Sequence, residues 1–112
     1  MSTLITASTI SAISGTTVTI PITVYDDDDA TKDMTGSTIV FTIARKVGST
    51  VLVGTALGTA TSAIASSVVT ISLPASSTEA LQGSYYFECK ATDTGSDVAV
   101  IAYGSITFKA NQ

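Results

Sequence analysis

The stretch GSYYFECKAT, from Gly83 to Thr92, alternates between two kinds of side chain at every step after its first two residues. The odd positions from Tyr85 to Ala91 are apolar, and the even positions between them are polar. Successive side chains of a β-strand point to opposite faces, so this period predicts a strand with one buried face. The turn residues DTGSD, 93–97, and the apolar stretch 98–110 follow directly, so the two stretches predict a β-hairpin.

The second strand of this hairpin contains a glycine that interrupts its pattern. Strict alternation puts Val100 and Ala102 on the inward face and Ile101 and Tyr103 on the outward face. A glycine inside a strand often marks a bulge or a close backbone approach. We therefore expect a bulge or a close backbone approach near Gly104.

Alternation continues in other parts of the chain. In TVTIPITVY the threonines and Pro21 share the outward side, and because proline has no N–H to donate, this strand is expected at a sheet edge or with a local irregularity. Together with the hairpin, the predicted strands number about seven. Outside the hairpin they are Leu4–Ile10 and residues 17–25, 36–46, 50–53 and 66–74.

The whole sequence has the size and composition of one all-β domain. Its 112 residues leave no room for a second core, and β-branched residues favour strands. About seven short strands separated by turns are typical of an immunoglobulin-like antiparallel β-sandwich. We expect one such domain over residues 1–112, in which residues 1–15 are either the first strand or an arm that adds to a partner's sheet.

Charge is sparse and local. Only 12% of the residues are charged, and the net charge of -4 equals the contribution of the run Asp26–Asp29. The five basic residues are scattered, so nucleic-acid binding lacks its main electrostatic attraction. The N-terminal stretch MSTLITASTISAISG has no basic region and is interrupted by serine and threonine, so it predicts neither a signal peptide nor membrane insertion.

The aspartates of VYDDDDATKDMTG raise the question of a metal site, with Asp26, Asp28 and Asp33 as weak candidate ligands. A calcium loop of the EF-hand kind needs a glycine at its sixth position and a glutamate at its twelfth. Counting from Asp26 or from Asp28 gives neither residue. The simpler interpretation is a hydrated loop whose aspartates bind their own backbone, and no metal or other cofactor is expected.

The sequence offers little for catalysis. It contains no histidine, so neither a serine nor Cys89 has an imidazole to activate it. Cys89 occupies an inward strand position and is interpreted as a small buried apolar residue. We therefore expect no enzymatic activity and no catalytic residues.

A pattern typical of one fold lies at the start of the quoted stretch. Gly83 ends a turn, Tyr85 follows two residues later, and Phe87 stands two residues after that. This spacing matches the tyrosine corner at the start of strand F of immunoglobulin-like domains, where Phe87 takes the place of the second cysteine. The chain has no tryptophan, so its relation is to a branch without the disulfide.

Two longer passages, residues 17–46 and 68–108, resemble the small immunoglobulin-like domain at the N-terminus of bacteriophage baseplate upper proteins and tail fibres. The family-like features are DMTGSTIVFT, SSTEALQGSYYF and the closing GSITF. The resemblance covers most of the chain, and its features are signatures of a fold.

In that family the domain is usually fused to a fibrous or host-binding region, whereas this sequence ends at Gln112. The resemblance therefore implies a non-enzymatic structural protein on the exterior of a phage virion, made in the host cytoplasm. Expected roles are a capsid decoration (cement) protein or a small head or tail accessory subunit, present as a homo-oligomer or in many copies and bound to capsid or tail proteins. The alternative is a tail-fibre or baseplate adaptor, or a module whose loops 26–36 and 93–97 recognise a host glycan or protein.

Outward-facing apolar and aromatic residues mark where such a partner would bind. Tyrosine supplies a large amphipathic contact area at low entropic cost. The residues assigned outward could form an ordinary sandwich surface or a subunit interface, and their number favours an interface. The interface candidates are Tyr86, Tyr103, Val40, Val68 and Ile101.

Overall fold

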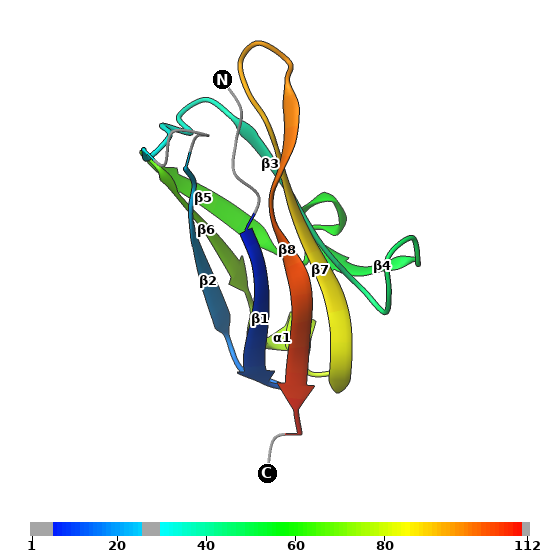
Figure 1. The fold of residues 1–112 in the computed structure, drawn as a ribbon. Helices are drawn as coiled ribbons and strands as arrows, with labels where there is room; N and C mark the ends of the chain where they lie inside the picture. The colour runs from blue at the N-terminus through cyan, green and yellow to red at the C-terminus, as the bar shows by residue number, and fades with distance from the viewer. Residues whose placement is uncertain (1–5, 26–29, 111–112) are drawn as a thin grey trace.

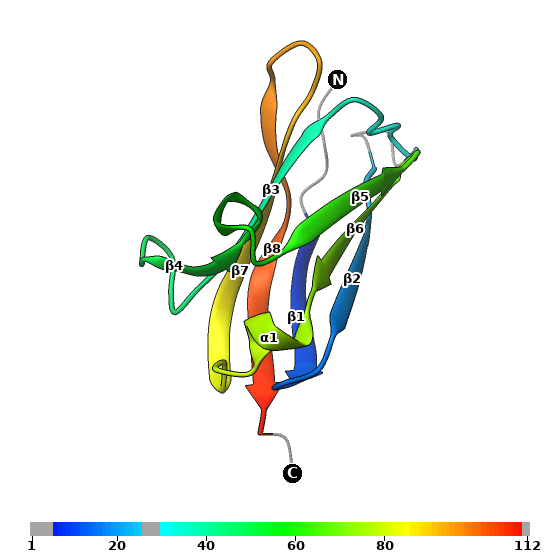
Figure 2. The same ribbon diagram turned by 180° about the vertical axis from the view of Figure 1, so that it is seen from behind.

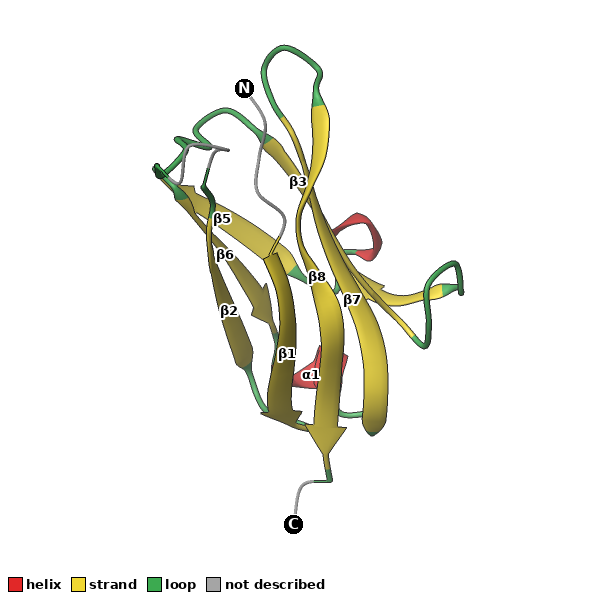
Figure 3. Cartoon of the chain, viewed as in Figure 1, coloured by secondary structure: helices red, strands yellow, loops and turns green. Residues whose placement is uncertain are grey.

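The chain forms two β-sheets packed face to face (Figure 1). The computed structural model describes residues 6–25 and 30–110. Colouring by secondary structure shows how little of the described chain is helical (Figure 3), and none of its helices is long or apolar enough to cross a membrane. In chain order the elements are β1 (Thr6–Ile13), β2 (Val18–Thr23), β3 (Thr38–Ala44), β4 (Val51–Gly54), the 3₁₀ turn η1 (Thr55–Leu57), β5 (Thr61–Ala65), β6 (Val68–Leu73), α1 (Ala75–Thr78), β7 (Gly83–Thr92) and β8 (Val98–Lys109).

The sheets differ in size. The larger has the strand order β1-β8-β7-β3-β4 and the smaller the order β2-β6-β5, and opposite views show the smaller sheet covering one face of the larger (Figures 1 and 2). The prediction of an all-β sandwich is confirmed. β2 is an edge strand, which is the first of the two placements that Pro21 allows.

The first and last strands pair in parallel, which corrects the expectation of a purely antiparallel sandwich. β1 runs beside β8 with Thr6 opposite Ala102 and Ile13 opposite Lys109. A parallel pair needs a long connection, and here the whole of the remaining chain lies between the two strands. The first strand was also predicted at Leu4–Ile10: it runs on to Ile13, and Leu4 itself lies outside the described residues.

The strand β5 was missed, so the predicted number of about seven was too low for the described chain, which contains eight strands. β5 pairs with β6 along its whole length, and Ser66 and Ser67 form the two-residue turn between them. Ser66 has a φ of 56°, a conformation usually left to glycine or asparagine. Without either residue in the turn, the sequence carries no hairpin signal here.

The core lies between the inner faces of the two sheets. Phe41 of β3 stacks on Phe87 of β7 with ring centroids 6.1 Å apart, and Tyr85 meets Phe108 edge to face at 6.0 Å. From the smaller sheet, Ile20, Ile22, Val69, Ile71 and Leu73 complete this layer. Alternation in the strands is therefore what builds the core.

The β7–β8 hairpin has its irregularity at Ile101, whereas the prediction placed one near Gly104. Cys89 is opposite Ala102, but the next residue, Lys90, is opposite Val100, so the register skips Ile101. The extra residue changes the phase of the alternation. As a result Ile101 and Ala102 are both buried, and the outward assignment of Ile101 is wrong.

Candidate protein-binding face

The outer face of the five-stranded sheet brings together three of the interface candidates. In the register of β3, β7 and β8, Thr42 lies opposite Glu88, and Glu88 opposite Tyr103. Two residues along these strands on the same face are Val40, opposite Lys90, and Tyr86, opposite Ser105. We call the surface formed by Val40, Tyr86, Glu88, Lys90 and Tyr103 the tyrosine face.

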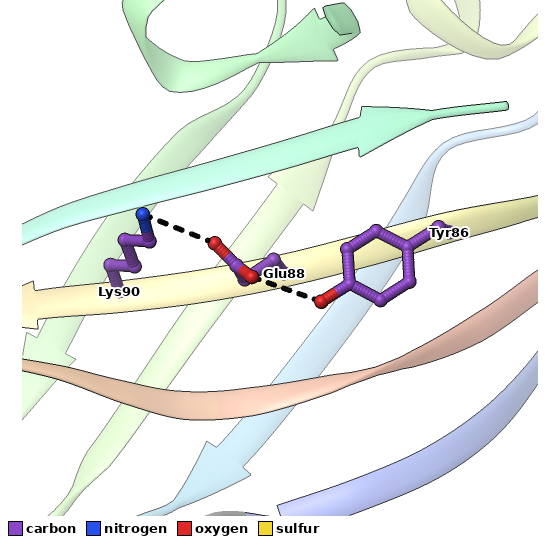
Figure 4. Close-up of polar contacts among 3 residues, drawn as sticks. All are labelled: Tyr86, Glu88 and Lys90. Atoms are coloured by element: carbon purple, nitrogen blue, oxygen red, sulfur yellow. Dashed lines mark hydrogen bonds and ion pairs between the residues drawn. The ribbon is translucent and has the colours of Figure 1, made fainter. Parts of the chain in front are cut away.

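A short chain of polar contacts runs along β7 on the tyrosine face (Figure 4). The Tyr86 hydroxyl donates a hydrogen bond of 2.9 Å to Glu88 Oε2, and Lys90 Nζ lies 3.4 Å from Glu88 Oε1. Desolvation, with the hydrogen bond and the negative charge of Glu88, raises the pKa of Tyr86. The glutamate is thus neutralised locally, which leaves a surface of aromatic and apolar groups with a satisfied polar centre.

Exposure separates the candidates on this face. Tyr103 is 38% exposed and Val40 is 37% exposed, so both present apolar surface to solvent. Tyr86 is half-buried beside Glu88. Leu52, which the β3–β4 register skips at the edge of the same sheet, is 39% exposed.

The structure places the other two interface candidates elsewhere. Ile101 is in the core and only 1% exposed, so it is no interface residue. Val68 is half-buried at the start of β6 and pairs with Thr23 and Ala65 in the smaller sheet. The tyrosine face therefore includes neither residue.

Of the three candidate metal ligands, the structure describes only Asp33. Asp26 and Asp28 lie outside the described residues. The Oδ1 of Asp33 accepts hydrogen bonds from the hydroxyl of Thr35 at 2.6 Å and from its N–H at 2.9 Å, and these bonds lower the pKa of Asp33. Within residues 6–25 and 30–110, no three acidic or cysteine side chains are grouped so that they could hold a metal ion.

The second predicted recognition loop closes on itself in a similar manner. Asp93 Oδ1 accepts hydrogen bonds from the N–H groups of Gly95 and Asp97, at 2.8 and 3.0 Å. A Cβ added at Gly36 would lie 3.0 Å from the Thr94 methyl carbon, so the two connections meet at one end of the sandwich (Figure 1). Asp33 and Asp93 therefore each bind the backbone of their own turn.

Cys89 lies in the core of the sandwich. Its exposed fraction is 0%, and burial raises the pKa of its thiol to about 12. A thiol that is neither ionised nor accessible does not act as a nucleophile. The geometry of Cys89 is that of a packed apolar side chain.

The turn before β7 is closed by a tyrosine hydroxyl. Tyr85 Oη donates to the carbonyl oxygen of Gln82 at 2.9 Å and accepts from the N–H of the same residue at 3.0 Å. Gly83 follows with a φ of 95°, in the region that favours glycine. Phe87 is 1% exposed and stacks on Phe41.

Two surface hollows were not predicted from the sequence. One of about 430 Å³ opens between the edge strands β1 and β2 and is lined mainly by apolar side chains, among them Ile10, Ile20 and Tyr25. The other, of about 330 Å³, lies at one end of the tyrosine face and is lined by Arg45 and Lys46 among others. The adjacent basic pair is the only sequence signal for the second hollow.

Compared with models of known protein families, the chain matches none. Nor does any curated protein match its sequence.

Proposed function

We infer that the sandwich is immunoglobulin-like. With strands lettered in immunoglobulin order, β2, β6 and β5 take the places of B, E and D, while β8, β7, β3 and β4 take those of G, F, C and C′. The tyrosine hydroxyl that closes the turn before β7 supports this correspondence, because β7 is then strand F.

The centre of the core supports the same inference. In antibody domains a tryptophan on strand C packs against the disulfide that joins strands B and F. Here Phe41 on β3 stacks against Phe87 on β7 at the corresponding positions. An aromatic pair then replaces the tryptophan and the disulfide.

We propose that the protein is a non-enzymatic structural module that binds another protein through the tyrosine face. From the resemblance of its sequence to phage modules, we propose further that it is mounted on the exterior of a phage virion, as a capsid decoration or cement protein or a small accessory subunit. The observation that carries the docking role is the gathering of Val40, Tyr86 and Tyr103 on one face.

Energetics favour this face as a docking surface. Binding energy at protein interfaces concentrates in a few aromatic and apolar anchors that exclude water. Val40 and Tyr103 are such anchors that remain partly exposed in the free chain. Since Glu88 is already paired with Lys90 and Tyr86, covering the face leaves its carboxylate with partners.

The direct experiment uses purified particles of the phage that encodes the chain. Particles lacking the protein are mixed with the purified chain, and bound protein and resistance to heat-induced DNA release are measured. Ligands that bind only the assembled state stabilise it by mass action, so addition is expected to raise the temperature of DNA release. The virion role would be contradicted if wild-type particles do not contain the chain and particles lacking it do not bind the added protein.

Variants then test the face itself. Val40→Ser and Tyr103→Ser are each expected to weaken particle binding about tenfold. Leu57→Ser is the matched control, because Leu57 is 57% exposed and lies in η1, outside the three strands that form the tyrosine face. Equal binding by all three variants would rule out this face as the docking surface.

A further inference from the structure

The hollow at one end of the tyrosine face contains positive charge without a counter-charge. The residues that line it are Arg45, Lys46, Val47, Ser84, Tyr85, Tyr86, Gly104 and Ser105. In the described part of the chain, the one ion pair joins Lys90 to Glu88, so neither Arg45 nor Lys46 has a carboxylate within 4.0 Å there. These two cations are adjacent on a chain whose net charge is -4.

The guanidinium of Arg45 is held in place. Its central carbon lies 5.5 Å from the centroid of the Tyr85 ring, within the range of a cation–π contact. That ring is itself fixed by two hydrogen bonds to Gln82 and by its contact with Phe108. A positioned arginine loses less entropy when it binds an anion, because part of its freedom is already lost.

We propose that this hollow binds a carboxylate from an acidic segment of a partner protein, with Arg45 as the main contact and Lys46 as the second charge. The planar guanidinium offers a fork of N–H donors that matches a carboxylate. Val47, which is 71% exposed, lies beside the charges. A peptide segment covers such an apolar side chain, whereas inorganic phosphate does not, and arginine, tyrosine and apolar groups together are typical of protein interfaces.

This site extends beyond the proposed function, because it is independent of whether the tyrosine face docks on a particle. Tyr103 and Val40 do not line the hollow. Tyr103→Ser is therefore expected to weaken docking of the face and to leave binding of an acidic peptide unchanged. The two proposals fail or succeed separately.

The test is a titration of the isotopically labelled full chain, followed by backbone amide chemical shifts. The probe is a capped peptide, Gly-Glu-Asp-Glu-Leu-Gly, and the control probe is the same peptide with glutamine and asparagine in place of the acids. We expect saturable shifts around Arg45–Val47, Ser84 and Ser105 with the acidic peptide only. Affinity is expected to fall as salt is added, since the contact is exposed and screened.

Matched variants assign the charge. Arg45→Gln is expected to lower the affinity for the acidic peptide about fivefold and Lys46→Gln about twofold, as for exposed ion pairs. Lys32→Gln, which removes the same charge in the connection before β3, whereas Arg45 follows the end of that strand, is expected to change nothing. Lys46→Gln has no packed ring to disturb, so it keeps the test valid if Arg45→Gln lowers the unfolding temperature.

Three outcomes would overturn the proposal. The first is equal binding of the acidic peptide and its amide counterpart. The second is shifts around Arg45 with inorganic phosphate but none with the acidic peptide. The third is an equal affinity of the Lys46→Gln, Arg45→Gln and Lys32→Gln variants.

Discussion

At the scale of single residues, Tyr85 joins the core to the turn before β7. Its ring packs against Phe108 inside the sandwich, and its hydroxyl satisfies both polar groups of the Gln82 backbone. One side chain thus fixes the position at which β7 enters the sheet.

Replacing Tyr85 by phenylalanine is expected to lower the free energy of unfolding by about 1–3 kcal/mol, because two backbone groups in a partly buried turn lose their partner. Urea unfolding followed by circular dichroism measures this loss. Tyr103→Phe is the control, since Tyr103 is exposed, and its effect is expected to stay within about 0.5 kcal/mol. Equal effects of the two changes would show that the Tyr85 hydroxyl does not hold the turn.

Cys89 is expected to be unreactive in the folded chain. With its pKa raised to about 12, roughly one thiol in ten thousand is ionised at pH 8, and the sulfur is also shielded from solvent. An aromatic disulfide reagent should modify no thiol in the native state and one per chain after unfolding in denaturant. Rapid modification of the native protein would place Cys89 outside the core.

Tyr86 is expected to make the free energy of unfolding fall as the pH becomes alkaline. Its pKa in the folded state is raised above the usual 10.0, so its hydrogen bond to Glu88 contributes fully below pH 10 and is lost as pH rises through the raised pKa. Above pH 10, therefore, wild type is expected to lose more stability than Tyr86→Phe, with Tyr103→Phe behaving as wild type. Parallel losses in wild type and Tyr86→Phe, measured by thermal unfolding, would contradict this coupling.

At the scale of elements, the strands with strong alternation were predictable and the irregular ones were not. Strands β2, β3, β6 and β7 bury every second side chain, so their period is visible in the sequence. In β5, TSAIA, only Ile64 packs against the core. A strand that buries one residue has no period to detect.

Ile101 shows how far the candidate site could be predicted from the sequence. Alternation alone assigned it outward, and only pairing with β7 reveals the skipped residue that turns it into the core. Tyr86 and Val40 lie where alternation puts them, because β3 and β7 pair without interruption over seven residues. Pairing between distant strands therefore decides what local pattern cannot.

The β5–β6 turn offers a test at this scale. Ser66 has a φ of 56°, which costs a residue with a Cβ about 1 kcal/mol, so Ser66→Gly is expected to raise the free energy of unfolding by up to that amount. Ser67→Gly is the matched control, because Ser67 has no positive φ, and it is expected to be neutral or destabilising. Urea unfolding of both variants checks the difference, and the opposite order would exclude strain at Ser66.

At the scale of the whole molecule, the sandwich is closed along one side by its first strand. β1 covers the edge of β8 over eight register pairs, and its residues Ile10 and Ala12 pack against the core. Without β1, the long strand β8 would become an open edge.

Deleting residues 1–13 is therefore expected to lower the free energy of unfolding by about 3 kcal/mol or more and to promote self-association through β8. Urea unfolding and size-exclusion chromatography measure the two effects. A synthetic peptide of residues 1–13 added in trans is expected to reverse both, whereas a scrambled peptide should not. A shortened chain as stable and monomeric as the full one would show that β1 is dispensable.

The parallel pairing of β1 and β8 also has a mechanical consequence. β1 begins beside Ala102, within β8, and β8 finishes beside Ile13, so the start of β1 and the end of β8 lie at opposite ends of their paired stretch (Figure 1). A tension applied through these two strands pulls them past each other along their length, so their hydrogen bonds are loaded together and not one after another. Antiparallel neighbours pulled from one end would instead open like a zipper. A module mounted in a structure under tension would therefore resist extension at the pairing of β1 with β8.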